Sequence, residues 1–386
     1  IVSLGDLNVV KFTVGGRDVI VAWGTGVLGD VLSGEYNVTD MYGNSLGVKN
    51  ANEIILDEEL IYLESVPENL FSEIPTVDLV AMTPLWPTVS GGPKVLNLDN
   101  TAPGGIASDG KYVYVSDTNN NRVLIFDINN LTDQAKAIRV IGQKDVFSRI
   151  PNNDTYGLYR PIGIATDGKW LFIADGGNSR IVVYNLTTLE PVLMLGNIEN
   201  ANVSVPIVEF PYTQIDDLAW DGKWLYATVS GGANIVVILK NLPYLLSEAI
   251  NGSYESEKVD FIVLGEEGIS GCSQYLMNSP VGLAVDDKYL YVADRLNGRV
   301  LIWDKNNLSD HAPANFVLGY EDFDCNAKVN DPAGSIIPGT YDVASNGKYI
   351  FVDDGRGRVL VFERDNLSNG MLAKFVVGRE NLTDLS

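Results

Sequence analysis

The sequence predicts an all-β fold, a β-propeller built from four-stranded antiparallel blades. Three observations support this prediction. A β-hairpin pattern with an Asp-Gly type of turn returns along the chain, each copy is followed by two further β-type runs, and most of the glycines fall at turns. A four-stranded sheet cannot bury both of its faces alone, so such units pack face to face around an axis.

The first two strands of each repeat form the hairpin. The clearest copy is 105–115, where side chains alternate on either side of the turn at Asp109-Gly110. The same pattern returns at 163–173, 217–227, 282–292 and 342–352.

The third and fourth strands follow from runs further along each repeat. The third is a β-branched run that starts with arginine, as in 122–126 and 299–303, and the fourth is a run that ends in glycine, as in 316–319 and 375–378. Each repeat therefore supplies one complete blade.

The number of blades follows from the hairpin turns. Six turns are indicated, at Asp57-Glu58, Asp109, Asp167, Asp221, Asp286 and Asn346, and Gly15-Gly16 offers a seventh. Seven blades are favoured, and the alternative is six blades with residues 1–49 as an N-terminal extension. The chain 1–386 is predicted to be a single domain, with degenerate repeats or an extension over 1–99 and clear repeats over 100–380.

Two insertions interrupt the repeats. Residues 66–95 are rich in proline and are expected to be irregular, and residues 240–257 are expected to hold one short helix with Pro243 near its start.

Residues 112–126 and 290–300 resemble NHL repeats, and the stretch 141–148, with Gly142-Gln143, is similar to the connection between blades in that family. The resemblance covers about 100–380. It implies a six-bladed or related propeller and says little about activity, because propellers carry many functions.

The charge disfavours some partners. Fifty acidic against 27 basic residues leave a formal net charge of −23, which repels nucleic acid and anionic lipid. No apolar run approaches the roughly 20 residues of a transmembrane helix.

An aspartate and an arginine recur together in four repeats. The pairs are Asp117 and Arg122, Asp175 and Arg180, Asp294 and Arg299, and Asp354 and Arg358. Where the aspartate is replaced by Val229, the arginine is replaced too, and its place is assigned to Asn234. Joint presence and joint loss indicate a structural ion pair rather than a ring of functional sites.

The two cysteines, Cys272 and Cys325, lie six or seven residues after a Leu-Gly step in equivalent loops of successive repeats. They are predicted to form a disulfide, which favours an oxidising compartment. The start of the sequence at Ile1, without a methionine, fits either a removed signal peptide or a start at the first ordered residue.

Nine Asn-x-Ser/Thr sequons are candidate glycosylation sites. Turn chemistry explains some of them, because Asn130, Asn307 and Asn366 share one repeat position. The nine are Asn37, Asn130, Asn153, Asn185, Asn202, Asn251, Asn307, Asn366 and Asn381.

No catalytic residue, cofactor-binding residue or metal ligand is assigned. His311 is the only histidine, and no nucleophile elbow or phosphate-binding loop occurs. A calcium site made of carboxylates remains open, with candidate clusters at 152–154, 216–217 and 321–324.

Two functions follow from these observations. The first is an extracellular or cell-surface propeller that is not an enzyme and that binds protein or glycan, or packs against copies of itself in a surface layer or filament. The second is a calcium-dependent hydrolase or lactonase-like propeller enzyme.

Overall fold

The computed structural model describes residues 2–4, 7–14, 17–28, 35–40, 45–64, 104–131, 137–145, 148–196, 203–252, 259–330, 340–354 and 357–382. The chain forms two compact units, Ile1–Gly92 and Pro93–Ser386. No helix among the described residues is long and apolar enough to cross a bilayer.

The first unit contains one six-stranded sheet with the strand order β1-β2-β3-β6-β4-β5. Its buried core includes Ile20, Tyr36 and Leu63. Its elements are β1 (Val2–Leu4), β2 (Leu7–Val14), β3 (Arg17–Val27), β4 (Glu35–Asp40), β5 (Ser45–Asn50), the 3-10 helix η2 (Ala51–Glu53) and β6 (Ile55–Glu64).

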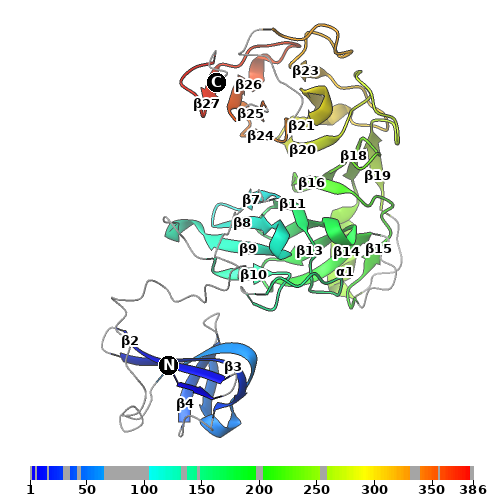
Figure 1. Cartoon of the computed structure of the whole chain (residues 1–386). Coiled ribbons are helices and arrows are strands. Elements are labelled where there is room, and N and C mark those ends of the chain that lie inside the picture. Colours follow the sequence, from blue (N-terminus) through cyan, green and yellow to red (C-terminus); the bar gives the residue numbers. More distant parts are fainter. Residues whose placement is uncertain are drawn as a thin grey trace. The chain divides into compact units, whose positions relative to one another are not determined.

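The second unit contains five antiparallel sheets that follow one another along the chain as propeller blades (Figure 1). Blade 1 is β7 (Ile106–Ser108), β8 (Tyr112–Asp117), β9 (Arg122–Asp127) and β10 (Arg139–Ile141). Blade 2 is β11 (Pro161–Thr166), β12 (Trp170–Asp175), β13 (Arg180–Asn185) and β14 (Glu190–Gly196), with β15 (Ile207–Val208) added in parallel.

The other three blades have four strands each. Blade 3 is β16 (Ile215–Trp220), β17 (Leu225–Val229), β18 (Ile235–Leu239) and β19 (Phe261–Leu264). Blade 4 is β20 (Pro280–Val285), β21 (Tyr289–Asp294), β22 (Arg299–Asp304) and β23 (Phe316–Leu318). Blade 5 is β24 (Val343–Ser345), β25 (Tyr349–Asp353), β26 (Val359–Glu363) and β27 (Phe375–Val377).

The prediction of seven blades is wrong, and so is the alternative of six, because the described residues form five blades. The predicted turn at Asp57-Glu58 does not exist, since β6 runs through it as one strand paired with β3 and β4. A hairpin does join β2 and β3 at the predicted position, with Val14 opposite Arg17. Its strands belong to the six-stranded sheet and not to a blade.

The five predicted hairpins of residues 104–382 are confirmed, and one side chain closes each turn. In blade 2, Oδ1 of Asp167 accepts the backbone N–H groups of Lys169 and Trp170, both at 2.9 Å. Asp109, Asp221, Asp286 and Asn346 make the same two bonds in the other blades. This local bonding explains why the turns could be found in the sequence.

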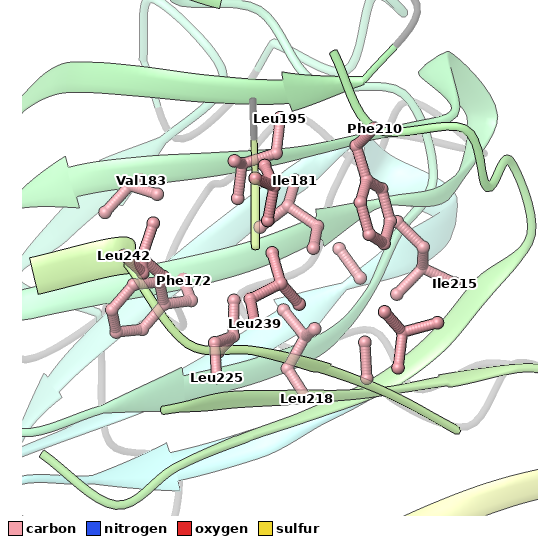
Figure 2. Close-up of a cluster of buried hydrophobic side chains, with 14 of the residues drawn as sticks. Phe172, Ile181, Val183, Leu195, Phe210, Ile215, Leu218, Leu225, Leu239 and Leu242 are labelled. Atoms are coloured by element: carbon pink, nitrogen blue, oxygen red, sulfur yellow. The ribbon is translucent and has the colours of Figure 1, made fainter. Parts of the chain in front are cut away.

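Each blade has a forward face toward the next blade and a backward face toward the preceding one. In β12, Trp170 and Phe172 pack in the core shared with blade 3, whereas Leu171 and Ile173 pack in the core shared with blade 1. Figure 2 shows the core between blades 2 and 3, with labelled side chains that include Phe172, Ile181, Leu225 and Leu239.

The predicted short helix is confirmed as α1 (Leu242–Asn251), with a proline in its first turn. Its buried side chains Leu242, Leu245 and Leu246 join the core of blades 2 and 3. Gly252 ends the helix in the left-handed region, at φ 68°. Residues 66–95, which were expected to be irregular, lie outside the described residues.

Candidate functional site

The recurring Asp–Arg pairs are ion pairs in the described structure. Arg180 Nε lies 2.7 Å from Oδ2 of Asp175, and both side chains are fully buried. The three other pairs have nitrogen–oxygen distances of 2.7, 2.7 and 2.6 Å, for Asp117–Arg122, Asp294–Arg299 and Asp354–Arg358. The prediction that they are structural is confirmed.

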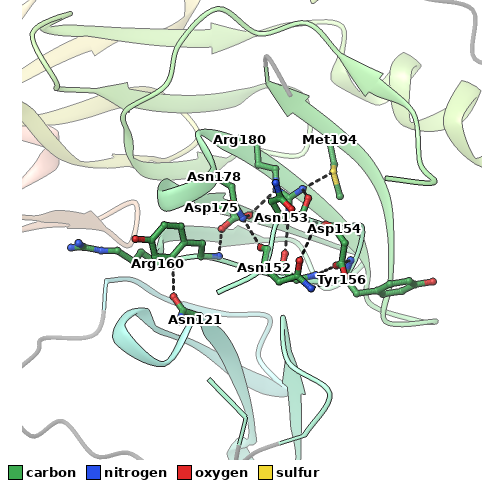
Figure 3. Close-up of polar contacts among 12 residues, drawn as sticks. Asn121, Asn152, Asn153, Asp154, Tyr156, Arg160, Asp175, Asn178, Arg180 and Met194 are labelled. Carbon is green, nitrogen blue, oxygen red and sulfur yellow. Dashed lines mark hydrogen bonds and ion pairs between the residues drawn. The ribbon is translucent and has the colours of Figure 1, made fainter. Parts of the chain in front are cut away.

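The guanidinium of Arg180 also fixes the loop that leads into its blade (Figure 3). It donates hydrogen bonds to the carbonyl oxygens of Asn153 and Asp154, both at 3.0 Å, and of Gly157 at 2.7 Å. The arginine is therefore used by the scaffold and offers no charge to a ligand.

The carboxylate of Asp175 is equally occupied. It accepts hydrogen bonds from the Tyr159 backbone N–H at 2.7 Å and from Nδ2 of Asn178 at 2.8 Å, besides the one from Arg180. Burial raises the pKa of Asp175, and the charge of Arg180 and these hydrogen bonds act against the rise.

Blade 3 is the exception, and the structure corrects one assignment there. Val229 stands opposite Ile235 in the register that Asp175 and Arg180 occupy in blade 2. The counterpart of the arginine is therefore Ile235 and not Asn234. Both Val229 and Ile235 are buried, so an apolar pair replaces the ion pair.

Asn234 has a different role. Its φ of 56° matches the left-handed backbone of Asn121 and Ser179, which immediately precede the arginines of blades 1 and 2. Its Oδ1 accepts the N–H of Ser279 at 2.9 Å, as Oδ1 of Asn121 accepts that of Arg160 at 2.9 Å. These bonds tie blade 1 to the loop that leads into blade 2, and blade 3 to the loop that leads into blade 4.

A pocket of about 260 Å³ lies at this end of blade 3. Its wall is formed by three segments: the loop before β16, the turn between β17 and β18, and the loop after β19. The lining residues are Pro211, Tyr212, Thr213, Gln214, Val229, Gly231, Gly232, Ala233, Glu267 and Gly268.

Two aspartates, Asp217 and Asp342, each lie against a glycine in the innermost strand of the preceding blade. A Cβ on Gly163 would lie 2.4 Å from Cα of Asp217, and a Cβ on Gly282 would lie 2.6 Å from Cα of Asp342, so only glycine fits against each aspartate. Burial, and then the charge of Asp342, raise the pKa of Asp217 to about 8.

The predicted disulfide is present. Cys272 and Cys325 are bonded, with their Cα atoms 5.9 Å apart. Cys272 lies in the connection from blade 3 to blade 4, and Cys325 lies in the connection from blade 4 to blade 5. The bond therefore joins the two loops on either side of blade 4.

Eight of the nine sequons have described backbone, and Asn202 lies outside the described residues. Asn153, Asn251 and Asn381 are exposed, as are Asn130, Asn307 and Asn366, while Asn185 is half-buried. Asn37 lies in β4. Asn130, Asn307 and Asn366 each end a 3-10 helix, η6 (Ile128–Asn130), η9 (Lys305–Asn307) and η10 (Arg364–Asn366), which agrees with their shared position in the repeat.

The oxygens of the candidate calcium clusters take part in local hydrogen bonds. Oδ1 of Asp154 accepts the N–H of Tyr156 at 2.9 Å and of Gly157 at 2.7 Å, and Oδ2 of Asp216 accepts the N–H of Ser230 at 3.0 Å. Within the described ranges, no three His, Cys, Asp or Glu side chains are grouped to hold a metal ion.

The lone histidine belongs to the scaffold between blades 3 and 4. Its Nδ1 lies 2.6 Å from the carbonyl oxygen of Gly265, and its backbone N–H donates to Val263 O at 2.8 Å. His311 thus holds its loop against the end of β19.

Comparison with known proteins supports a propeller repeat. The LVIVD repeat model matches residues 104–139 and 281–309, which lie in blades 1 and 4. Together with the five sheets, this supports a β-propeller repeat family, whereas the NHL type stays a prediction. No curated protein matches.

Two solved structures are similar over most of the chain. The crystal structure of a nidogen/laminin complex has a TM-score of 0.44 and 16% identity, covering 68% of this chain and 75% of that one. KlHsv2 with loop 6CD replaced by a Gly-Ser linker has a TM-score of 0.38 and 9% identity, covering 70% of this chain and 64% of that one.

Proposed function

We propose that the protein is an extracellular structural module, not an enzyme, that packs against copies of itself in a surface layer or filament. The observation that supports this proposal is that the two end blades expose apolar side chains at positions that every other blade buries. Exposed apolar positions of this kind mark interaction surfaces.

The backward face of blade 1 exposes Ile106. Ile106 pairs with Val115 of β8 and is 69% exposed. In the other four blades the residue at the same position of the first strand is only 3–4% exposed. The counterparts are Ile164, Leu218, Leu283 and Val343. The middle strands of the same face are already buried, as Leu124 and Phe126 show, so the uncovered part is the innermost strand.

The forward face of blade 5 exposes Val377 and Phe375, at 58% and 48%. Val377 pairs with Val359, the residue after Arg358. The counterparts of Val377 in the other blades are no more than 4% exposed. They are Ile141, Leu195, Leu264 and Leu318.

The two uncovered faces are of opposite kinds. Each of the four interfaces inside the propeller joins a forward face to a backward face, through the innermost strands of consecutive blades. In the described part of the chain, no contact of comparable extent joins blade 5 to blade 1. Blade 5 of one copy therefore fits blade 1 of another in a head-to-tail contact, which forms rings or filaments.

The extracellular location has its own support. A disulfide is typical of proteins from oxidising compartments, and six of the described sequon asparagines are exposed, as glycosylation requires. The strongly negative charge keeps such a surface soluble.

The test is the oligomeric state of the purified protein, measured by light scattering over a range of concentrations. The wild type is expected to form assemblies, whereas Ile106→Asp and Val377→Asp are each expected to be monomers, because a buried carboxylate would remain unpaired. Ile150→Asp is the matched control, since Ile150 is 71% exposed in a connecting loop.

Mixing the two variants distinguishes a head-to-tail contact from a symmetric one. Each variant keeps one intact face, so an equimolar mixture of Ile106→Asp and Val377→Asp should give a dimer and nothing larger. A wild type that stays monomeric at all concentrations, or a mixture that stays monomeric beside an assembling wild type, would overturn the head-to-tail proposal.

A further inference from the structure

The pocket of blade 3 exists because this blade lacks polar side chains that other blades place there. Val229 and Ile235 replace the ion pair, and the turn between them is one residue longer than in blade 2. In blade 2 an asparagine, Asn178, fills the turn and bonds to Asp175. In blade 3 the residues Gly231-Gly232-Ala233 carry nothing larger than a methyl group.

The lining of the pocket includes a backbone donor that lacks the acceptor found in other blades. In blade 2 the backbone N–H of Tyr159, two residues before the first strand, donates to Asp175 at 2.7 Å. In blade 4 the N–H of Asn278, at the same position, donates to Asp294 at 2.7 Å. The counterpart in blade 3 is the N–H of Thr213. Val229 stands in the place of the aspartate and has no side-chain oxygen to accept it.

Two side chains in the wall of the pocket, those of Gln214 and Glu267, add further hydrogen-bonding groups. Gln214 lies over the turn, so that a Cβ on Gly231 would be 1.4 Å from its Oε1. Glu267 lines the pocket, and burial, and then the charges of Glu267 and Asp310, raise the pKa of Tyr212.

These groups favour a neutral ligand that both donates and accepts hydrogen bonds. An anion would face Glu267 and a net charge of −23. A cation would be served by Glu267 and by Oε1 of Gln214, but it would leave the N–H groups of Thr213 and of the Gln214 amide without an acceptor. Hydroxyl groups on adjacent carbons can use both kinds of partner, and the exposed Pro211 offers apolar surface to a ring.

We infer that this pocket binds one neutral sugar ring of a glycan. Its volume of about 260 Å³ suits a single ring rather than an oligosaccharide. The site is distinct from the end faces of the propeller, so this binding does not depend on assembly.

Saturation-transfer NMR with the methyl glycosides of glucose, galactose and mannose tests the inference on the full chain. At least one glycoside is expected to bind, and Glu267→Ala and Gln214→Ala should each weaken it about tenfold, because each removes a hydrogen-bonding group. Glu266→Ala is the matched control, since it removes the same charge from an exposed neighbour that does not line the pocket.

Three outcomes would overturn the inference. They are the absence of binding by all three glycosides, sugar binding that neither pocket variant weakens, and a preference of the pocket for lysine amide or for acetate. The oligomeric state of the same samples reports on the proposed function separately, because both pocket variants leave Ile106 and Val377 intact.

Discussion

Asp217 is a residue whose charge the fold tolerates poorly. Its pKa of about 8 lies far above the ordinary 3.8, through burial and the charge of Asp342. The folded protein therefore holds a proton that the unfolded chain releases, and stability is expected to fall as the pH rises from about 4 to about 8.

Asp217→Asn should remove this part of the pH dependence. The variant keeps an oxygen for the N–H of Leu283, which Oδ2 of Asp217 now accepts at 3.0 Å, and it carries no charge. We expect it to be more stable than the wild type at pH 8, by on the order of 1–3 kcal/mol, with a smaller difference at pH 4. Denaturant unfolding at both pH values measures this, with the exposed Asp324→Asn as control. A difference that does not depend on pH would contradict it.

Some residue roles could be read from the sequence and others could not. The Asp–Arg pairs were predictable because both partners appear and disappear together. The assignment of Asn234 was wrong by one position, because the turn after Val229 is one residue longer and only the strand register shows it. The pocket of blade 3 was missed, although the joint loss of the pair together with Gly231-Gly232 marked the place.

The ion pair of blade 2 and the apolar pair of blade 3 offer a matched comparison between elements. Arg180→Ile alone should destabilise the protein by about 3–5 kcal/mol, because it leaves the buried carboxylate of Asp175 unpaired. The double variant Asp175→Val with Arg180→Ile copies blade 3 and should cost less than the single one. A double-mutant cycle by denaturant unfolding tests this, and a double variant as unstable as the sum of the singles would contradict it.

Hairpins were the elements that the sequence predicted best. Their turns depend on hydrogen bonds between residues two and three apart, as in Asp167 with Lys169 and Trp170. Which further strand a hairpin pairs with depends on contacts between residues that are distant in the sequence. The hairpin of β2 and β3 was therefore predictable, whereas the pairing of β3 with β6 in a separate sheet was not.

The number of blades is a property of the whole molecule that repeat counting did not give. The sequence contains seven turn-like patterns, and two of them, at Gly15-Gly16 and Asp57-Glu58, fall in the first unit. Alternation of apolar and polar side chains predicts a strand in a two-faced sheet, but it does not show whether that sheet is a propeller blade or belongs to a separate unit. The pairing of the described strands shows which sheet each hairpin joins.

The disulfide connects parts of the propeller that are distant in sequence. Cys272 and Cys325 are 53 residues apart and lie on either side of blade 4, so the bond keeps the two ends of this blade together when the chain unfolds. On the chain-entropy model, closing a loop of this length stabilises the folded state by about 4 kcal/mol. The double variant Cys272→Ser with Cys325→Ser should therefore melt on the order of 10 °C lower. Reductant should lower the wild-type melting temperature to the same value and leave the double variant unchanged. Calorimetry with and without reductant checks both expectations, and a wild-type melting temperature that does not respond to reductant would show that the bond does not contribute to stability.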